Sequence, residues 1–192
     1  MTGRARLAPV NLPDFGMPEA MPELPAELYA TRLARLRERA RGRGYDHLLV
    51  YADREHSANL AYLSGFDPRF EEALLIVGPS GDPAILAGNE CVGLAGAAPL
   101  PMRRHRFQDF SLPGQPRDRS RPLADILGDE GIGPGSRVGV VGWKTYAALG
   151  ASDLPAYLVD ELRSAVSPAG VIENATDLLI DAAGGLRVIN EL

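Results

Sequence analysis

Cysteine is nearly absent from this sequence. Cys91 is the only cysteine in 192 residues, which excludes an intrachain disulfide framework and a zinc site built from several thiolates. So little cysteine fits the reducing cytosol, and we expect a cytoplasmic protein. Long apolar runs are missing too: none approaches the roughly 20 residues that a membrane-spanning helix needs, and the N-terminus has no signal-peptide pattern. We therefore expect no membrane partner.

Positive charge is in short supply. Lys and Arg number 20 against 25 Asp and Glu, so the formal net charge is −5 and the pI is about 5.2. An acidic surface does not attract polyanions, and we expect no nucleic-acid partner. The length suits one globular domain or at most two small ones. The 21 Gly and 16 Pro residues are too many for a helical bundle and predict frequent turns.

The first 25 residues show no apolar periodicity. They contain five prolines, so residues 1–25 are predicted to form an extended Pro-rich arm outside the core. The pattern changes at about Pro25, after which four apolar residues recur at steps of four, three and four: Tyr29, Leu33, Leu36 and Ala40. Most of the arginines fall elsewhere on the helical wheel. This spacing predicts an amphipathic helix that ends near Gly42.

The chain from there to about residue 185 alternates predicted strands and helices. Strands are expected at 47–51, 73–77, 83–87, 102–107, 137–141 and 171–172, and helices at 122–127, around Tyr146 and at 157–162. The five-residue turn 78–82 joins two of these strands into a β-hairpin. Residues 61–66 are short enough to form a further strand of the same sheet. The pattern predicts an α/β domain with a mixed β-sheet flanked by helices.

Two glycine-containing segments resemble phosphate-binding loops but lack the required context. The glycines of residues 131–135 precede a predicted strand instead of following one, which favours a turn. In residues 139–145, Trp143 separates a glycine from Lys144, so the spacing of a P-loop fails. Neither segment predicts a nucleotide site.

The remaining catalytic residue types are scattered. His47, His56 and His105 are far apart in the sequence and have no metal-ligand spacing. Ser80 lies in the predicted hairpin turn and not at a strand-to-helix corner, which argues against a serine hydrolase. Cys91 has no motif around it and is interpreted as a small buried hydrophobe.

Basic residues are most concentrated after residue 102. The cluster contains Arg103, Arg104, His105 and Arg106, followed by Arg117, Arg119 and Arg121. These side chains could bind a phosphate or a nucleic-acid backbone. Charges on an edge strand also prevent unwanted strand pairing, and the acidic total favours that second interpretation.

A polar turn follows the first predicted strand at its carboxyl end, where α/β sheets expose groups to ligands. It gathers Asp53, Arg54, Glu55 and His56 just before Asn59. Polar and aromatic residues concentrate again a little later, at Tyr62, Phe66, Asp67, Arg69 and Phe70. The spacing leaves two interpretations open: a solvated loop with internal ion pairs, or a binding surface.

The ordered motifs of residues 28–185 resemble the N-terminal domain of the creatinase, prolidase and aminopeptidase P family of metallopeptidases. The resemblance rests on the amphipathic helix, Gly44-Tyr45-Asp46 with strand 48–50, the run NLAYLSGF from Asn59 to Phe66, strand 74–77, and Arg137-Val138-Gly139-Val140. The Asn-Leu-x-Tyr-Leu-Ser/Thr-Gly-Phe core is fairly specific to that domain. The resemblance implies a ribonuclease H-like α/β fold for residues 26–185. It also implies that residues 186–192 begin a linker to a C-terminal catalytic domain.

The resemblance places catalysis in that C-terminal domain. There, two aspartates, a histidine and two glutamates hold two divalent metal ions (manganese, cobalt or zinc) that support hydrolysis of the bond before proline. None of these ligands can be carried over to this sequence. We therefore expect no catalytic residue, metal ligand or cofactor in this chain, and a domain boundary at Leu192. The parent protein is expected to be a metal-dependent Xaa-Pro peptidase that acts on short peptides.

The resemblance further implies that this domain builds a homo-oligomer, most simply a dimer, and restricts access to the partner subunit's active site. By position, six residues are candidates for the rim of that site: Asn59, Ala61, Tyr62, Phe66, Asp67 and Arg69. Aminopeptidase P members have a large aromatic residue where this chain has Ala61, which argues against stacking on a proline peptide at this position. Prolidase-like dipeptides, creatine-like substrates and unrelated substrates all stay open. The alternative function is a free-standing protein-interaction module of the pseudo-peptidase type. A small-ligand enzyme built on residues 53–59 would lack a recognisable nucleophile and base.

Overall fold

The fold is built around one mixed β-sheet of six strands. The computed structural model describes residues 8–11, 13, 16–17, 24–180 and 185–187. The strands are β1 (His47–Ala52), β2 (Ala73–Val77), β3 (Ala84–Ala87), β4 (Arg103–Arg106), β5 (Arg137–Val141) and β6 (Val171–Asn174), in the spatial order β4-β3-β2-β1-β5-β6. β2 is antiparallel to both β1 and β3, while β1/β5, β5/β6 and β3/β4 are parallel. The prediction of a mixed sheet is confirmed.

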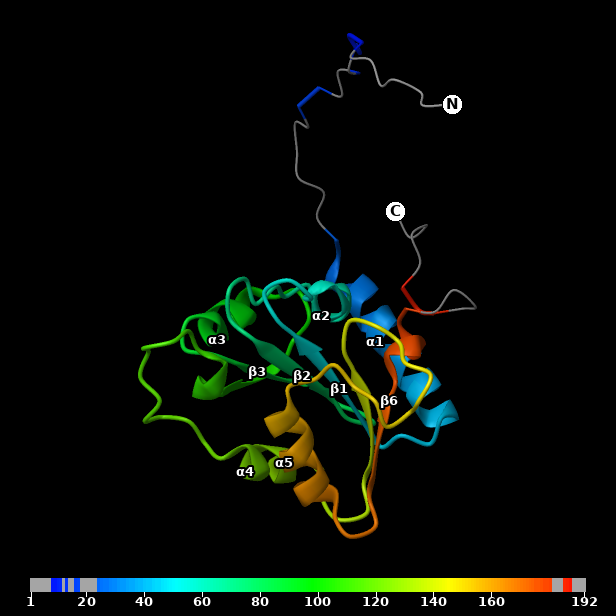
Figure 1. Cartoon of the computed structure of the whole chain (residues 1–192), viewed down its shortest axis with the longest axis vertical. Helices are drawn as coiled ribbons and strands as arrows, with labels where there is room; N and C mark the ends of the chain where they lie inside the picture. The colour runs from blue at the N-terminus through cyan, green and yellow to red at the C-terminus, as the bar shows by residue number, and fades with distance from the viewer. Residues whose placement is uncertain (1–7, 12, 14–15, 18–23, 181–184, 188–192) are drawn as a thin grey trace, which may run out of the picture.

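Helices cover both faces of the sheet (Figure 1). They are α1 (Ala26–Gly42), α2 (Ala58–Ser64), α3 (Cys91–Leu94), α4 (Leu123–Asp129) and α5 (Ala156–Val166), with short 3₁₀ turns at Ala95–Ala97, Gln108–Phe110 and Thr176–Leu178. Successive side chains of a strand point to opposite faces. Accordingly, Leu48 and Val50 pack with the helices α1, α2 and α3, whereas Leu49 and Tyr51 pack with α4 and α5. The domain therefore has two apolar cores separated by the sheet.

The first helix forms as the apolar spacing predicts. Its four periodic apolar residues are all buried. Arg32 departs from the expected polar face: its side chain is also buried, its guanidinium lies 3.9 Å from the centre of the Tyr62 ring, and its Nη1 donates to the Tyr62 carbonyl over 2.9 Å. Arg32 thereby joins α1 to α2.

The predicted hairpin and turns are confirmed. β2 and β3 pair in the register Leu74↔Leu86, and the connecting turn contains Ser80 and the left-handed Gly81, whose φ is +72°. Residues 131–135 form turns before β5, with Gly131 at φ +83° and Gly135 at φ +86°. A left-handed φ favours glycine because a Cβ atom would clash there.

The strand expected at residues 61–66 is wrong. Residues 58–64 form α2, because Leu60 and Leu63, three positions apart, are both fully buried on one helical face. Gly65 ends the helix with φ +72°, and a Cβ at this position would lie only 2.4 Å from Pro99 Cγ. Position 65 therefore requires glycine both for its backbone and for its packing.

The helix expected around Tyr146 is also wrong. Residues 142–155 form bends and turns without a helix. The Asp153 carboxylate accepts hydrogen bonds from the backbone N–H groups of Trp143 at 2.7 Å and Lys144 at 3.2 Å. A side-chain acceptor thus satisfies amides that would otherwise begin a helix.

The segments outside the predicted domain, residues 1–25 and 186–192, are described only in part. Of the Pro-rich arm, residues 8–11, 13, 16, 17, 24 and 25 are described; they are exposed and belong to neither helix nor strand. Of the expected linker start, only Leu186 and Arg187 are described. None of the described helices is long and apolar enough to cross a lipid bilayer.

Candidate functional site

The candidate site lies at the carboxyl ends of β1 and β5. These two strands are parallel neighbours, so the segments that follow them leave the sheet at the same edge (Figure 1). The polar turn 53–57 follows β1 and leads into α2, while residues 142–155 follow β5. This is the edge at which open α/β sheets present groups to ligands.

Asp53 and His56 form a hydrogen-bonded pair in the turn after β1. His56 Nδ1 lies 3.0 Å from each carboxylate oxygen, and Asp53 Oδ1 also accepts from the backbone N–H groups of Glu55 and His56 at 2.8 Å. Burial alone raises the pKa of Asp53, but the hydrogen bonds from the His56 ring and these two amides outweigh it and lower the pKa below its ordinary value. The carboxylate is therefore ionised at neutral pH and holds the imidazole in place.

The imidazole of His56 is covered by an indole. Its ring stacks on Trp143 with 4.5 Å between centroids and an angle of 19° between planes. Lys144 Nζ lies 4.7 Å from the centre of the Trp143 ring and 4.9 Å from that of Tyr146. Trp143 is still 43% exposed, so this aromatic and cationic group offers a surface to a partner molecule.

Asn59 connects three segments behind this surface. The residue is buried, its Nδ2 donates to the Gly142 carbonyl over 2.7 Å, and its Oδ1 accepts from Arg187 Nη1 at 2.6 Å. α2 is thereby joined both to the segment after β5 and to the most C-terminal described residue. Asn59 positions the site and is not itself available at the surface.

A cavity of about 190 Å³ lies between these groups. Among the described residues, it is lined by Glu55, His56, Ala58, Asn59, Trp143, Ile180 and Arg187; we call it the candidate pocket. It offers one acid, one cation and a stacked aromatic face, but none of these lining residues is a Ser, Thr, Cys or Lys nucleophile. No group of three or more His, Cys, Asp or Glu in the described part of the chain can hold a metal ion. The acid, the cation and the aromatic face are groups that can recognise a polar molecule.

The residues predicted from the sequence divide into two groups in space. His56, Glu55 and Asn59 line the candidate pocket beside Asp53, whereas Arg54 is exposed and forms a 3.6 Å ion pair with Glu55. The remaining predicted residues, Ala61 to Arg69, lie on α2 or just after it and away from the candidate pocket.

The second group surrounds the end of α2. Tyr62 is partly buried and its hydroxyl donates to the Leu186 carbonyl over 3.2 Å. Ala61 is partly exposed, while Phe66 is 4% exposed and belongs to the core. Asp67 and Arg69 form an exposed turn in which the Asp67 carboxylate accepts from the Arg69 N–H at 2.8 Å. None of these residues lines the candidate pocket in the described structure.

Three residues of the site were missed by sequence reasoning. Trp143 and Lys144 were considered only as part of a failed P-loop pattern, and Arg187 only as part of a linker. The available signal was that Trp143 is the only tryptophan of the chain and follows a buried strand. Arg187 contacts Asn59, more than 120 positions away in the sequence, so no local sequence pattern could have indicated this contact.

Cys91 behaves as predicted. Its side chain is fully buried, its Sγ donates to the Pro68 carbonyl, and its backbone N–H donates to the Glu71 carboxylate over 2.9 Å. Burial raises the pKa of the thiol to about 12. A protonated, buried thiol is not a nucleophile.

Sequence comparisons identify no relative, but structural comparisons do identify the fold. Neither a protein-family model nor a curated protein matches this sequence. The N-terminal creatinase/prolidase domain of an X-Pro dipeptidase from Streptococcus pyogenes superposes with a TM-score of 0.53 at 17% identity, covering 76% of this chain and 94% of that one. The corresponding domain of a dipeptidase from Streptococcus thermophilus gives a TM-score of 0.52 at 18% identity, covering 76% of this chain and 92% of that one.

Complete enzymes share the fold over part of their length. The prolidase from Pyrococcus horikoshii OT3 superposes with a TM-score of 0.51 at 12% identity, over 77% of this chain and 33% of the prolidase. The matched region of this chain thus spans about a third of that enzyme. The α/β fold of this domain is that of creatinase/prolidase N-terminal domains, as the resemblance implied.

Proposed function

We propose that this chain is the non-catalytic N-terminal domain of a metal-dependent Xaa-Pro peptidase. In this proposal it takes part in oligomerisation and restricts the access of peptides to the active site of a partner subunit. The observation that carries the proposal is the fold, which matches separately determined N-terminal domains of dipeptidases over 92% and 94% of their length.

The chemistry of the candidate pocket supports a non-catalytic role. The His56–Asp53 pair has no neighbouring nucleophile among the described lining residues. The two divalent metal ions of the resembled enzymes, manganese, cobalt or zinc, find no ligand set within the described residues of this chain. In this proposal the domain carries out no hydrolytic step, and the metals are held by a separate catalytic domain.

The geometry of the same pocket supports a role in gating. Trp143 is partly exposed and lies just after the carboxyl end of β5, and Arg187 contacts Asn59 behind it. An exposed aromatic group beside a cation is the kind of surface that contacts peptides and partner subunits. In this proposal, Trp143 and Lys144 lie at the substrate entrance, together with the exposed Asp67 and Arg69.

The test uses the full gene product with two single substitutions. Trp143→Ala removes the exposed indole, whereas Leu94→Ala removes an exposed apolar side chain of α3, which packs near β3 and β4. Hydrolysis is measured with manganese on an Xaa-Pro dipeptide and on longer Xaa-Pro peptides. Gating predicts that only Trp143→Ala changes the preference for peptide length, with little change of kcat on the dipeptide.

Two results would contradict the proposal. If Trp143→Ala and Leu94→Ala leave the same length preference, the candidate pocket does not gate the substrate. If the purified 192-residue chain itself hydrolyses Xaa-Pro peptides with manganese, the domain is catalytic. A gene product without peptidase activity that binds basic proteins at physiological salt would favour the interaction module instead.

A further inference from the structure

The basic cluster at residues 103–121 is divided by the structure into paired and unpaired side chains. Arg103 and His105 both contact the Glu130 carboxylate. Two others pair with aspartates: Arg117 with Asp109 at 2.9 Å and Arg121 with Asp129 at 2.7 Å. β4 lies at the edge of the described sheet, as expected for a charged strand. Prevention of unwanted strand pairing at this edge therefore explains only some of the basic residues of the cluster.

Three arginines of the cluster remain without a partner. The guanidinium groups of Arg104, Arg106 and Arg119 make no hydrogen bond or ion pair with any described residue. They also converge on the same surface: Arg104 and Arg106 line one hollow, and Arg106 and Arg119 line a second one of about 540 Å³. We call this second hollow the edge pocket; its other lining residues are Asn89, Gln108, Gln115, Pro116 and Asp118.

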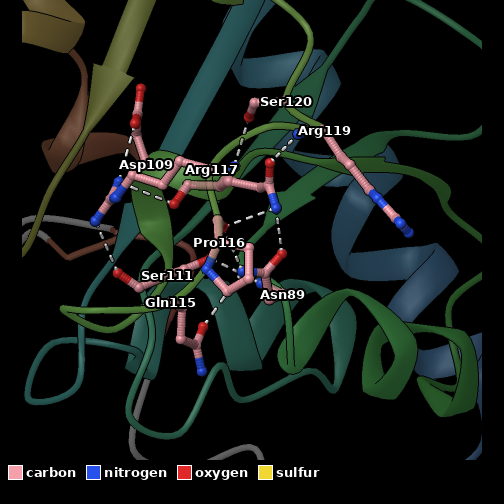
Figure 2. A network of polar contacts seen from close by, with 9 residues as sticks. Asn89, Asp109, Ser111, Gln115, Pro116, Arg117, Arg119 and Ser120 are labelled. Atoms are coloured by element: carbon pink, nitrogen blue, oxygen red, sulfur yellow. Dashed lines mark hydrogen bonds and ion pairs between the residues drawn. The ribbon is translucent and has the colours of Figure 1, made fainter.

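A buried glutamine fixes the shape of the edge pocket. Gln108 is 2% exposed; its Nε2 donates to Asn89 Oδ1 and to the Pro116 carbonyl at 2.8 Å, and its Oε1 accepts from the Arg119 N–H. Figure 2 shows this network, with the Arg119 guanidinium extending away from it and contacting none of the residues drawn. The backbone of Arg119 is therefore held while its side chain stays free.

A second arginine holds the same loop from the other side. Arg117 Nη1 donates to the Gln108 carbonyl at 3.0 Å, and its Nη2 lies 3.4 Å from the Ser111 carbonyl (Figure 2). With Gln108, this contact makes the loop 111–120 a defined wall of the pocket. A rigid wall lowers the entropic cost of ordering a ligand.

The charge inside the edge pocket is positive. Asp118 is the one acid among the described lining residues, against Arg106 and Arg119, with Arg104 in the adjoining hollow. Glu90 is near, but its carboxylate accepts a hydrogen bond from Gln115 Nε2. A guanidinium group can bind a phosphate or carboxylate through two parallel N–H···O bonds, and two unpaired guanidinium groups line this pocket. The pocket volume also falls in the range of small-molecule sites, about 300–1,000 Å³.

We propose that the edge pocket binds a small oxyanion, a phosphorylated or dicarboxylate small molecule, between Arg106 and Arg119. The site lies between the edge strand β4 and the loop 111–120. Arg104, in the adjoining hollow, adds positive charge next to it. The edge pocket lies beside β4, whereas the candidate pocket lies at the ends of β1 and β5, and β3 and β2 lie between β4 and β1 in the sheet. The proposal is therefore independent of the proposed peptidase role.

Calorimetric titration of the 192-residue chain tests this proposal. The probes are inorganic phosphate, pyrophosphate and succinate, each at physiological ionic strength, so that the phosphate and dicarboxylate sources are compared directly. Arg106→Gln and Arg119→Gln are expected to raise the Kd by about tenfold or more each, because each removes a charge-assisted hydrogen bond. Arg121→Gln is the matched control, since it removes the same charge from an exposed arginine paired with Asp129; its Kd should change less than about twofold.

Chemical modification of the wild-type chain tests the same site without a substitution. Phenylglyoxal modifies accessible guanidinium groups, and mass spectrometry then locates the modified arginines. The proposal predicts that a saturating probe protects Arg106 and Arg119 but not Arg121. Equal loss of binding in Arg121→Gln, no saturable heat with any of the three probes, or unprotected Arg106 and Arg119 would each overturn it and leave edge protection as the role of these arginines.

Discussion

Asn59 is expected to support the candidate pocket mechanically, and Asn59→Ala tests this. The substitution removes the hydrogen bond to the Gly142 carbonyl and the bond from Arg187, at 2.7 and 2.6 Å. The first bond is buried and joins α2 to the segment after β5. The bond from Arg187 joins α2 to a residue that follows α5 in the chain. Both contacts are lost together, and the Gly142 carbonyl loses its side-chain partner.

The size of the effect follows from these two bonds. The buried bond to Gly142 contributes about 1 kcal/mol net, and the bond from the Arg187 guanidinium about the same once its exposure to solvent is discounted. The free energy of unfolding is therefore expected to fall by about 2 kcal/mol. For a chain of this size that corresponds to a Tm lower by about 4 to 8 °C.

Urea denaturation followed by circular dichroism measures this loss, with the slope m unchanged if unfolding stays two-state. Ser57→Ala is the control, because Ser57 precedes α2 but makes no capping hydrogen bond with its side chain. We expect that control to change stability by less than about 0.5 kcal/mol. A loss below that value in Asn59→Ala, or an equal loss in both variants, would refute the role of Asn59 as a support.

Three further outcomes are expected. Gly65→Ala should lower stability by about 2 kcal/mol or more, since it strains a left-handed residue and drives a Cβ into Pro99; an unchanged thermal melt would contradict the packing. The Cys91 thiol, whose pKa burial raises to about 12, should resist a thiol reagent at pH 8 until urea unfolds the chain; fast reaction in the native state would be the opposite result. The lowered pKa of Asp53 adds stability above its unfolded pKa of about 3.9 that is lost as pH falls through the folded pKa. Between about pH 5 and pH 2, wild type should therefore lose more stability than Asp53→Asn, and parallel curves would count against the His56 pair.

The parts of the fold that repeat a simple period could be predicted from the sequence. The step of three and four in α1 and the short apolar runs of β1, β2 and β5 indicate one buried face or a buried strand. The glycine-containing turn 78–82 between two of these runs predicted the hairpin of β2 and β3. Prediction failed where the tertiary structure decides: residues 58–64 are apolar enough for a strand but place Leu60 and Leu63 on one buried helical face.

The candidate site was only partly predictable for a related reason. The turn after β1 is visible as a local cluster of polar residues, and the structure keeps Asp53 and His56 together. The other side of the pocket comes from β5, whose parallel pairing with β1 brings Trp143 beside His56 from 87 positions away. No sequence spacing encodes that contact. The resemblance indicated residues between Asn59 and Arg69, of which only Asn59 lines the candidate pocket in the described structure.

The most direct measurement is to read the source gene beyond the codon for Leu192. The proposal that this domain gates a metallopeptidase predicts that the open frame continues for about 200 residues, the length of a further domain. It also predicts two aspartates, one histidine and two glutamates, spaced along that stretch to hold two metal ions. A stop codon directly after Leu192 would contradict the proposal and leave a free-standing interaction module.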